Sequence, residues 1–263
     1  MAEQQPIRFG DGDAFEQSMG VWSRLAGEVF LDWLAPEPGL RWLDVGSGGG
    51  AFAELIMRRC APAELHGIDP SEGQLAYAGA RPGTRGAEFR QGDAVALPHP
   101  DDRFDAAVMA LVIFFVPEPA RGVAEMARVV RPGGLVAAYA WDILGGGFPF
   151  EPVPTALRAA GLSVALPPSV EAARTEALRA LWTGAGLREV ETRAITVRRS
   201  FADFEAFWAA TTRAERLAAT LAGMAPGEVE ALKAWVCARL PAEADGRIDH
   251  EARANAIKGR VPG

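Results

Sequence analysis

Apolar runs of strand length alternate five times with segments of helical spacing between residues 21 and 142, beginning with a predicted helix at 21–34. This alternation predicts a parallel sheet with helices on both faces, which is a doubly wound α/β fold. The longest apolar run, residues 106–116, is shorter than the roughly 20 residues that cross a bilayer. We therefore interpret it as a buried strand that is covered on both faces.

The pattern changes after residue 142. A loop rich in Gly, Pro and Phe leads into two segments, 169–186 and 202–240, that are predicted to be mostly helical. Further strands are predicted at 189–201 and 246–261. We expect these parts to extend the same sheet and to place a helical cap beside it.

A glycine cluster in the stretch LDVGSGGG, residues 43–50, directly follows the first predicted strand. Glycines there let a ligand approach the main chain, and a doubly wound sheet binds ligands at the carboxyl ends of its strands. Gly46, Gly48 and Ala51 fit the dinucleotide pattern G-x-G-x-x-[GA], and an acid that suits ribose hydroxyls follows about twenty residues later. That pattern alone leaves a dinucleotide open.

The carboxylate of Asp44, just before the turn, distinguishes the two kinds of cofactor. A pyrophosphate prefers the N–H groups of a helix N-terminus and would be repelled by an acid there. A ligand with an ammonium and a sulfonium group would be attracted. The sequence therefore favours S-adenosylmethionine (SAM) over NAD(P).

Several spaced motifs together resemble the class I SAM-dependent methyltransferases, in particular the group with the methyltransferase type 11 domain. The motifs are LDVGSGGG, GIDPS, GDAVALP, FDAAVMALVIFFVPEP and EMARVVRPGGLVAAYAW. The resemblance covers about residues 15–142 and implies a Rossmann-like, mainly parallel sheet of seven strands. It also implies that SAM is the cofactor.

The resemblance assigns the methionine and ribose parts of SAM to the first two strands. Asp44 would act on the ammonium, directly or through water, and Gly46, Ser47 and Gly48 would lie against the methionine part. Asp69 would accept hydrogen bonds from both ribose hydroxyls. In each case a carboxylate meets a donor or a cation, as a buried acid requires.

Further residues are assigned to the adenine and the sulfonium. Pro70 and Gln74 would lie near the adenine ring. Asp93 would accept from the adenine amino group, and the Ala94 N–H would donate to a ring nitrogen. Leu111, near the end of the fourth strand, would bring main chain beside the sulfonium.

The N-terminal segment resembles a lid helix that many relatives place over SAM. Phe15, Met19 and Trp22 would cover the cofactor there. Relatives often carry Arg where Val21 stands, so a carboxylate clamp at that position is in doubt, and Arg24 is the candidate replacement. Residues 1–142 are thus expected to form the lid and the SAM-binding core, and 143–263 the substrate-side insertions and last strands of one domain.

Structural roles remain open for several of these residues. Asp69 and Asp93 could close turns, and Trp22 could belong to the core. Trp141 and Asp142 either contact a substrate or support the loop after the fifth strand.

No functional role is predicted for the three histidines or for the arginine pair at 198–199. His66 is expected to be structural, His99 to lie in a loop near the cofactor side, and His250 to lie at the surface. Arg198 and Arg199 are expected to be solvated.

Composition narrows the function further. The net charge is −7, and the absence of a Lys/Arg cluster argues against a nucleic-acid partner. Two cysteines and three scattered histidines predict neither a disulfide framework nor a metal site. The polar start and the lack of a long apolar run predict a cytoplasmic protein without a membrane partner. Nothing in the sequence predicts an oligomeric state.

The expected activity is transfer of a methyl group from SAM to a small-molecule acceptor, with Phe148 and Phe150 in an apolar wall. Such a transfer is an in-line displacement that depends mainly on positioning, so no catalytic residue is predicted. Two alternatives stay open. One is an NAD(P)-dependent oxidoreductase, and the other is a non-catalytic SAM-binding module of the same fold.

Overall fold

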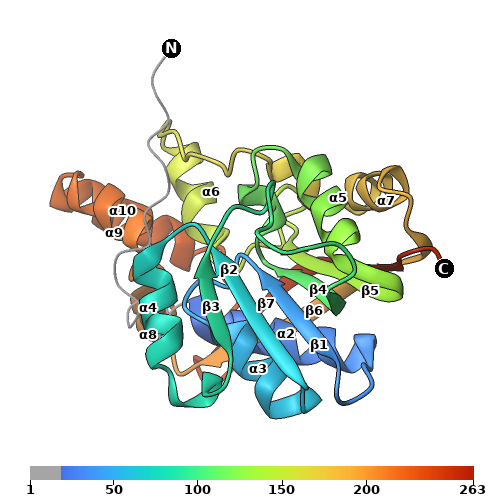
Figure 1. The fold of residues 1–263 in the computed structure, drawn as a ribbon. Helices are drawn as coiled ribbons and strands as arrows, with labels where there is room; N and C mark the ends of the chain where they lie inside the picture. The colour runs from blue at the N-terminus through green and yellow to red at the C-terminus, as the bar shows by residue number, and fades with distance from the viewer. Residues whose placement is uncertain (1–18) are drawn as a thin grey trace.

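The computed structural model describes residues 19–263, apart from the side chains of residues 215 and 216. Seven strands form one sheet in the order β3-β2-β1-β4-β5-β7-β6, which lies at the centre of Figure 1. The first five strands in sequence are parallel, and β7 is antiparallel to both of its neighbours. The strands are β1 (Arg41–Val45), β2 (Glu64–Asp69), β3 (Glu88–Gln91), β4 (Phe104–Ala110), β5 (Val130–Trp141), β6 (Arg188–Phe201) and β7 (Ile248–Arg260).

Helices cover both faces of the sheet, as predicted. Helices α2 and α3 pack against each other on one face, and α5 and α7 pack on the other. The α-helices are α2 (Val21–Leu34), α3 (Ala51–Cys60), α4 (Glu72–Ala80), α5 (Pro119–Val129), α6 (Pro152–Ala159), α7 (Thr175–Gly184), α8 (Phe204–Thr212), α9 (Glu215–Ala222) and α10 (Pro226–Cys237). No helix within residues 19–263 is both long and apolar enough to cross a membrane.

The strand order creates a switch point between β1 and β4. The chain moves outward from β1 through β2 to β3, and then returns to the other side of β1 to form β4. The connections that leave β1 and β4 therefore diverge at their carboxyl ends, where doubly wound sheets bind ligands. The glycine turn lies at this point.

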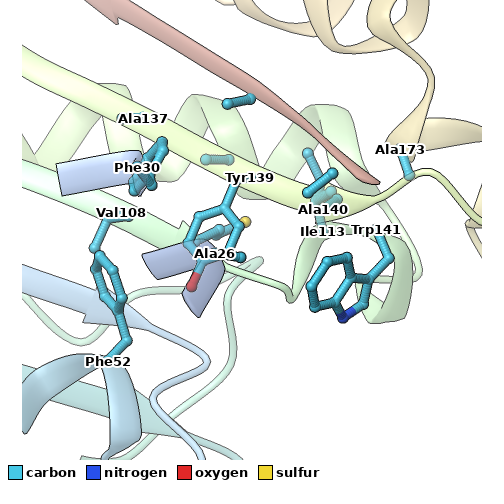
Figure 2. Packing of buried hydrophobic residues seen from close by; sticks show 14 of the residues in the cluster. Ala26, Phe30, Phe52, Val108, Ile113, Ala137, Tyr139, Ala140, Trp141 and Ala173 are labelled. Carbon is cyan, nitrogen blue, oxygen red and sulfur yellow. The ribbon is translucent and has the colours of Figure 1, made fainter. Parts of the chain in front are cut away.

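Helix α2 is held to the sheet by an aromatic cluster. Phe30 lies 4.6 Å from the ring of Tyr139 on β5 and 6.0 Å from Phe52 on α3, measured between ring centroids, and Figure 2 shows the three rings together. Gly27 allows close packing of α2 on α3, since a Cβ there would lie 2.6 Å from the Leu55 side chain. The predicted bounds of this helix are confirmed.

Strand β4 is shorter than predicted. The apolar run 106–116 does not stay extended: β4 ends at Ala110, and Ile113–Phe115 forms a short 3-10 helix, η3. The break is at Leu111, whose φ is +64°, while its N–H donates to the Tyr139 carbonyl at 2.8 Å. A left-handed non-glycine residue is uncommon, and an unbroken apolar run gives no sign of it.

The C-terminal part forms the predicted helical cap. Strands β6 and β7 pair along Phe201↔Ile248 to Arg188↔Arg260, whereas β7 pairs with β5 only from Ala254 onward. Residues 248–253 therefore extend the β6–β7 pair beyond the carboxyl end of β5. Helices α8 to α10 are inserted between β6 and β7, and α10 packs against α6.

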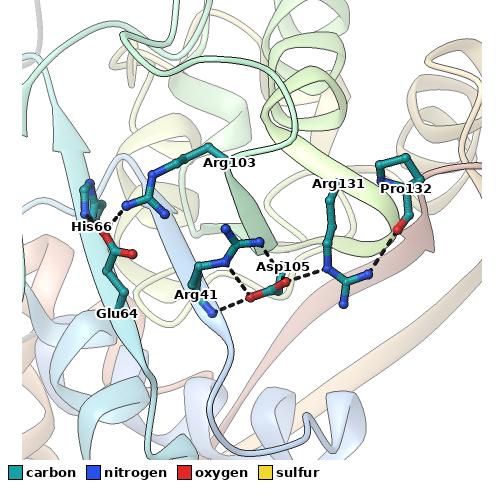
Figure 3. Close-up of polar contacts among 7 residues, drawn as sticks. All are labelled: Arg41, Glu64, His66, Arg103, Asp105, Arg131 and Pro132. Atoms are coloured by element: carbon teal, nitrogen blue, oxygen red, sulfur yellow. Dashed lines mark hydrogen bonds and ion pairs between the residues drawn. The ribbon is translucent and has the colours of Figure 1, made fainter.

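The opposite edge of the sheet is fixed by ion pairs (Figure 3). Asp105 accepts from the main-chain N–H of Arg41 at 2.8 Å, from the Arg41 guanidinium at 3.0 and 3.1 Å, and from Arg131 at 2.5 Å. These hydrogen bonds hold the pKa of Asp105 well below its usual range. This cluster ties the amino-terminal ends of β1, β4 and β5 together, away from the glycine turn.

His99 belongs to this opposite edge and not to the cofactor side where it was expected. Its ring lies 4.9 Å from Phe104, the first residue of β4, and 5.3 Å from His66. Burial lowers the pKa of His99 to about 4, so the ring is neutral at physiological pH. The structural reading of His66 agrees with this position, since its Nε2 lies 2.6 Å from Glu64.

Candidate cofactor site

The glycine turn is tied closely to β2. Gly46 and Ser47 both donate their N–H groups to the carbonyl of Ile68, at 2.7 and 2.9 Å. Gly46, Gly48 and Gly50 have φ values of +76°, +49° and +78°, a conformation that costs other residues about 1–2 kcal/mol. The backbone geometry of the turn therefore accounts for glycine at these three positions.

Gly46 and Gly48 face different surroundings. A Cβ on Gly46 would lie 2.5 Å from Cγ1 of Val112, in the segment that follows β4. A Cβ on Gly48 would meet nothing nearer than the Gln74 side-chain oxygen at 3.9 Å. Gly46 thus allows close contact between two loops, whereas the space over Gly48 is open.

This difference predicts unequal effects of alanine at the two positions. Gly46→Ala is expected to lower the free energy of unfolding by roughly 2–5 kcal/mol, because overpacking adds to backbone strain. Gly48→Ala should cost about 1–2 kcal/mol, from strain alone. Urea denaturation measures both. Val112→Ala in the Gly46→Ala background should recover part of the loss, and equal losses at the two glycines would contradict this picture.

Asp44 is the most unusual residue at the site. Its side chain is completely buried, and neither carboxylate oxygen has a hydrogen-bond partner in the described chain. Burial, together with the charge of Asp69, raises the pKa of Asp44 to about 7. A buried, unpartnered carboxylate is costly and is best explained by a cationic or donor group that completes it.

Two other polar groups lie close to Asp44 or its turn. Tyr139 on β5 is buried, and burial and the charge of Asp44 raise the pKa of its hydroxyl. The hydroxyl of Ser47 is buried without a partner among the described residues. A Cβ on Gly67 of β2 would lie 2.9 Å from that hydroxyl, so the Ser47 side chain is directed toward β2. Tyr139 was not expected from the sequence, where it was only one residue of an apolar strand.

Asp69 lies at the carboxyl end of β2, next to the turn. Its Oδ2 accepts from the Gly48 N–H and its Oδ1 from the Ser71 N–H, both at 2.9 Å. Burial raises the pKa of Asp69 and outweighs these two hydrogen bonds. Each oxygen still has a second lone pair, so the turn-closing role and a ribose-binding role are compatible.

The residues expected near adenine line the next part of this edge. Ser71 caps α4 by accepting from the Gln74 N–H at 3.4 Å, and Pro70 precedes it on an exposed loop. Asp93 accepts from the Val95 N–H at 3.0 Å and closes the turn after β3, with Ala94 inside that turn. Asp93 is exposed, and its contact with adenine remains a prediction.

Trp22 is fully buried, and it lies edge-on to the His250 ring at 5.8 Å. Trp22 belongs to the core in the structure, and its contact with a cofactor stays a prediction. Phe15 lies outside the described residues.

The surface position expected for His250 is wrong. Its ring also lies 5.2 Å from Phe207, and its Nε2 lies 2.9 Å from the Pro149 carbonyl oxygen.

Trp141 and Asp142 differ in their surroundings. Asp142 accepts from the Arg253 guanidinium at 2.6 and 3.0 Å and from the Gly145 N–H at 3.1 Å, so it supports the loop after β5. Trp141 is buried, and its indole N–H has no partner in the described chain. Substrate contact by Trp141 remains a prediction.

The described residues contain no group of three or more His, Cys, Asp or Glu side chains suited to a metal ion. What the site does contain is a carboxylate without a partner among residues 19–263, a second carboxylate with spare acceptor capacity, and open space over Gly48. It also contains the left-handed Leu111 at the end of β4, directly across the switch point. This set fits a ligand with a positive charge and vicinal hydroxyls.

Comparisons with known proteins relate part of the chain to methyltransferases. Residues 43–138 match the family model described as a methyltransferase domain. The chain is 40% identical over 96 residues to 2-methyl-6-phytyl-1,4-hydroquinone methyltransferase 2 of Oryza sativa, which covers 36% of this chain and 28% of that protein. It is 33% identical over 122 residues to 2-phytyl-1,4-naphtoquinone methyltransferase of Synechococcus elongatus, covering 44% and 51%. The chain therefore spans about half, or less, of the length of these relatives.

Solved structures share the fold over most of the chain. A phosphoethanolamine N-methyltransferase of Haemonchus contortus, solved with S-adenosylhomocysteine (SAH), gives a TM-score of 0.57 at 18% identity and covers 95% of this chain and 57% of that one. The [4+2]-cyclase SpnF gives 0.53 at 26% identity, covering 92% and 81%. Taken with the strand order, these likenesses show that the chain shares the fold of these proteins, and residues 43–138 are similar to a methyltransferase domain.

Proposed function

We propose that this chain binds SAM at the carboxyl ends of β1 and β2 and transfers its methyl group to a small-molecule acceptor. The observation that carries the proposal is Asp44, a fully buried carboxylate without a partner in the described chain, placed directly before the glycine turn. An ammonium group satisfies such a carboxylate, and a pyrophosphate would be repelled by it. This supports SAM over NAD(P), as does the match to a methyltransferase family model.

The residues that would hold SAM follow from their surroundings. Asp44 would take the ammonium, and the free lone pairs of Asp69 would take the ribose hydroxyls. The main chain at Gly46 and Gly48 would lie along the methionine part, with Ser47 between them, and Leu111 would face it from β4. SAM supplies a methyl group made electrophilic by its sulfonium, so the protein's task is to orient the acceptor and to exclude water.

The acceptor is proposed to be a small organic molecule. The relatives include methyltransferases named for phytyl quinones and for fatty acids, which are small and partly apolar. The cap is rich in aromatic side chains, including Phe204, Phe207 and Trp208.

The two free cysteines, one of them exposed, fit the reducing cytoplasm that the sequence predicts.

A second candidate is a SAM-binding protein that does not transfer the methyl group. It is favoured by one observation, the structural likeness at 26% identity to SpnF, which is named as a cyclase. One fold carries several chemistries, so the fold alone does not decide between them.

Calorimetric titration with SAM, SAH and NADH tests the cofactor. The proposal expects SAM and SAH to bind and NADH not to bind. Release of SAH in the presence of quinols or fatty acids then tests methyl transfer. Binding of SAM without SAH release from any acceptor would favour the second candidate, and binding of NADH alone would overturn both.

The affinity for SAH is expected to depend on pH through Asp44. Its pKa of about 7 means that the carboxyl is largely protonated below pH 6 in the free protein, whereas the ammonium requires the ionised form. Affinity should therefore fall roughly tenfold from pH 7.0 to pH 5.5, where the ammonium itself stays charged. Titration at the two pH values measures this, and the Asp44→Asn variant should show a flat response. A flat response of the wild type would contradict the assignment.

A further inference from the structure

Arg199 on β6 does not behave as a solvated residue. Its neighbour Arg198 is 76% exposed and pairs with Glu251, as a surface arginine should. The Arg199 side chain is turned the other way: its Nη1 is buried and has no hydrogen-bond partner in the described chain. Its guanidinium carbon lies 4.6 Å from the centre of the Phe201 ring, which holds the side chain in place. The expectation of a solvated pair is right for Arg198 and wrong for Arg199.

A second positive charge faces Arg199 from helix α2. This helix packs against β6, and burial together with the charge of Arg24 lowers the pKa of Arg199. A buried, unpartnered guanidinium N–H beside another cation is unfavourable on its own. An anion bound by Arg199 would remove that cost.

The sheet order places Arg199 away from the expected cofactor position. Strand β6 lies four positions from β1 and three from β4, which corresponds to about 19 and about 14 Å at ordinary strand spacing. Arg199 pairs across the ladder with His250, in the part of the β6–β7 pair that extends beyond the carboxyl end of β5. Arg199 therefore belongs to the cap side of the site, beside the aromatic cluster of Trp22, His250 and Phe207.

We propose that Arg199 binds an oxyanion, a carboxylate or a phosphate, carried by the methyl acceptor. A guanidinium suits either group, since its planar fork matches two oxygens at once. The distance from β4 means that this anion lies at the end of an elongated acceptor, remote from the atom that is methylated. That the methyl acceptor carries this anion rests on the proposed function, whereas the anion site itself does not.

Titration of the whole protein with benzoate and phenyl phosphate, followed by NMR of the arginine Nε–Hε resonances, tests the site. We expect at least one of these probes to shift the Arg199 resonance. Arg199→Gln should then weaken its binding on the order of tenfold or more, as expected for loss of a charge-assisted hydrogen bond. The two probes distinguish a carboxylate from a phosphate.

Arg198→Gln is the matched control, because it removes the same charge one residue away from an exposed position. It should leave probe binding unchanged, and neutral benzamide should bind more weakly than benzoate to the wild type. No shift of Arg199 with either probe, or equal losses in the two variants, would overturn the proposal. The shift is measured on the wild type, so the test holds even if Arg199→Gln folds poorly. SAH binding, titrated separately, tests the proposed function without bearing on the anion site.

Discussion

Asp44→Asn is expected to weaken SAH binding roughly 10- to 100-fold and, at pH 8, to raise the melting temperature of the free protein. The loss of affinity is that of a charge-assisted hydrogen bond, about 1.5–3 kcal/mol. The gain in stability has the opposite sign because the variant removes a buried charge that has no partner in the described chain. We expect a gain on the order of 1–3 kcal/mol, or several degrees for a chain of this length.

The sign of the stability effect follows from the pKa of Asp44. Its folded-state value, about 7, lies above the ordinary value of 3.8, so between these pH values the folded protein binds more protons than the unfolded chain. Stability from this group is therefore lost as the pH rises toward 7. Differential scanning calorimetry should show the gain of Asp44→Asn at pH 8 and little gain near pH 4. Glu88→Gln, at a side chain that is 77% exposed, is the control and should change neither property. Lower stability of Asp44→Asn at pH 8 would show that the carboxylate has a stabilising partner in the free protein.

Asp69→Asn is the variant with the other large expected effect. Its carboxylate is proposed to receive both ribose hydroxyls while it holds the N–H groups of Gly48 and Ser71. Loss of the charge should lower SAH affinity on the order of 100-fold, at about 1.5–3 kcal/mol for each hydrogen bond to a charged group. Isothermal titration calorimetry measures it directly.

A thermodynamic cycle separates ribose binding from support of the turn. The wild type should bind SAH far more tightly than an analogue that lacks both ribose hydroxyls. Asp69→Asn should lose most of this preference if the carboxylate contacts the hydroxyls. If the preference is kept in full, Asp69 acts only on the turn, and the ribose assignment is wrong.

The regular part of the fold could be predicted from the sequence because each element carries its own signal. Helix 21–34 and strand β7 were expected within a few residues, since their apolar residues recur at the spacing of a helix and a strand. The glycine turn was expected at a switch point, and the strand order places it there. The preference for a cationic ligand at Asp44 also follows from the sequence, because an acid directly before a glycine turn has few chemical explanations.

Other features depend on contacts that one segment cannot reveal. The end of β4 at Ala110 was missed because the left-handed Leu111 that follows it lies within an unbroken apolar run. The inward turn of Arg199 and the burial of His250 depend on the register of β6 with β7 and on α2 behind them. The closeness of Tyr139 to Asp44 requires the order of β1, β4 and β5.

A crystal structure with SAH bound would test the central claim most directly. We predict the SAH ammonium at the Asp44 carboxylate, the ribose hydroxyls at Asp69, and the chain of the ligand along the open face of Gly48. SAH seated elsewhere, for instance in the groove of about 430 Å³ between α6 and α10, with Asp44 still unpartnered, would contradict the account.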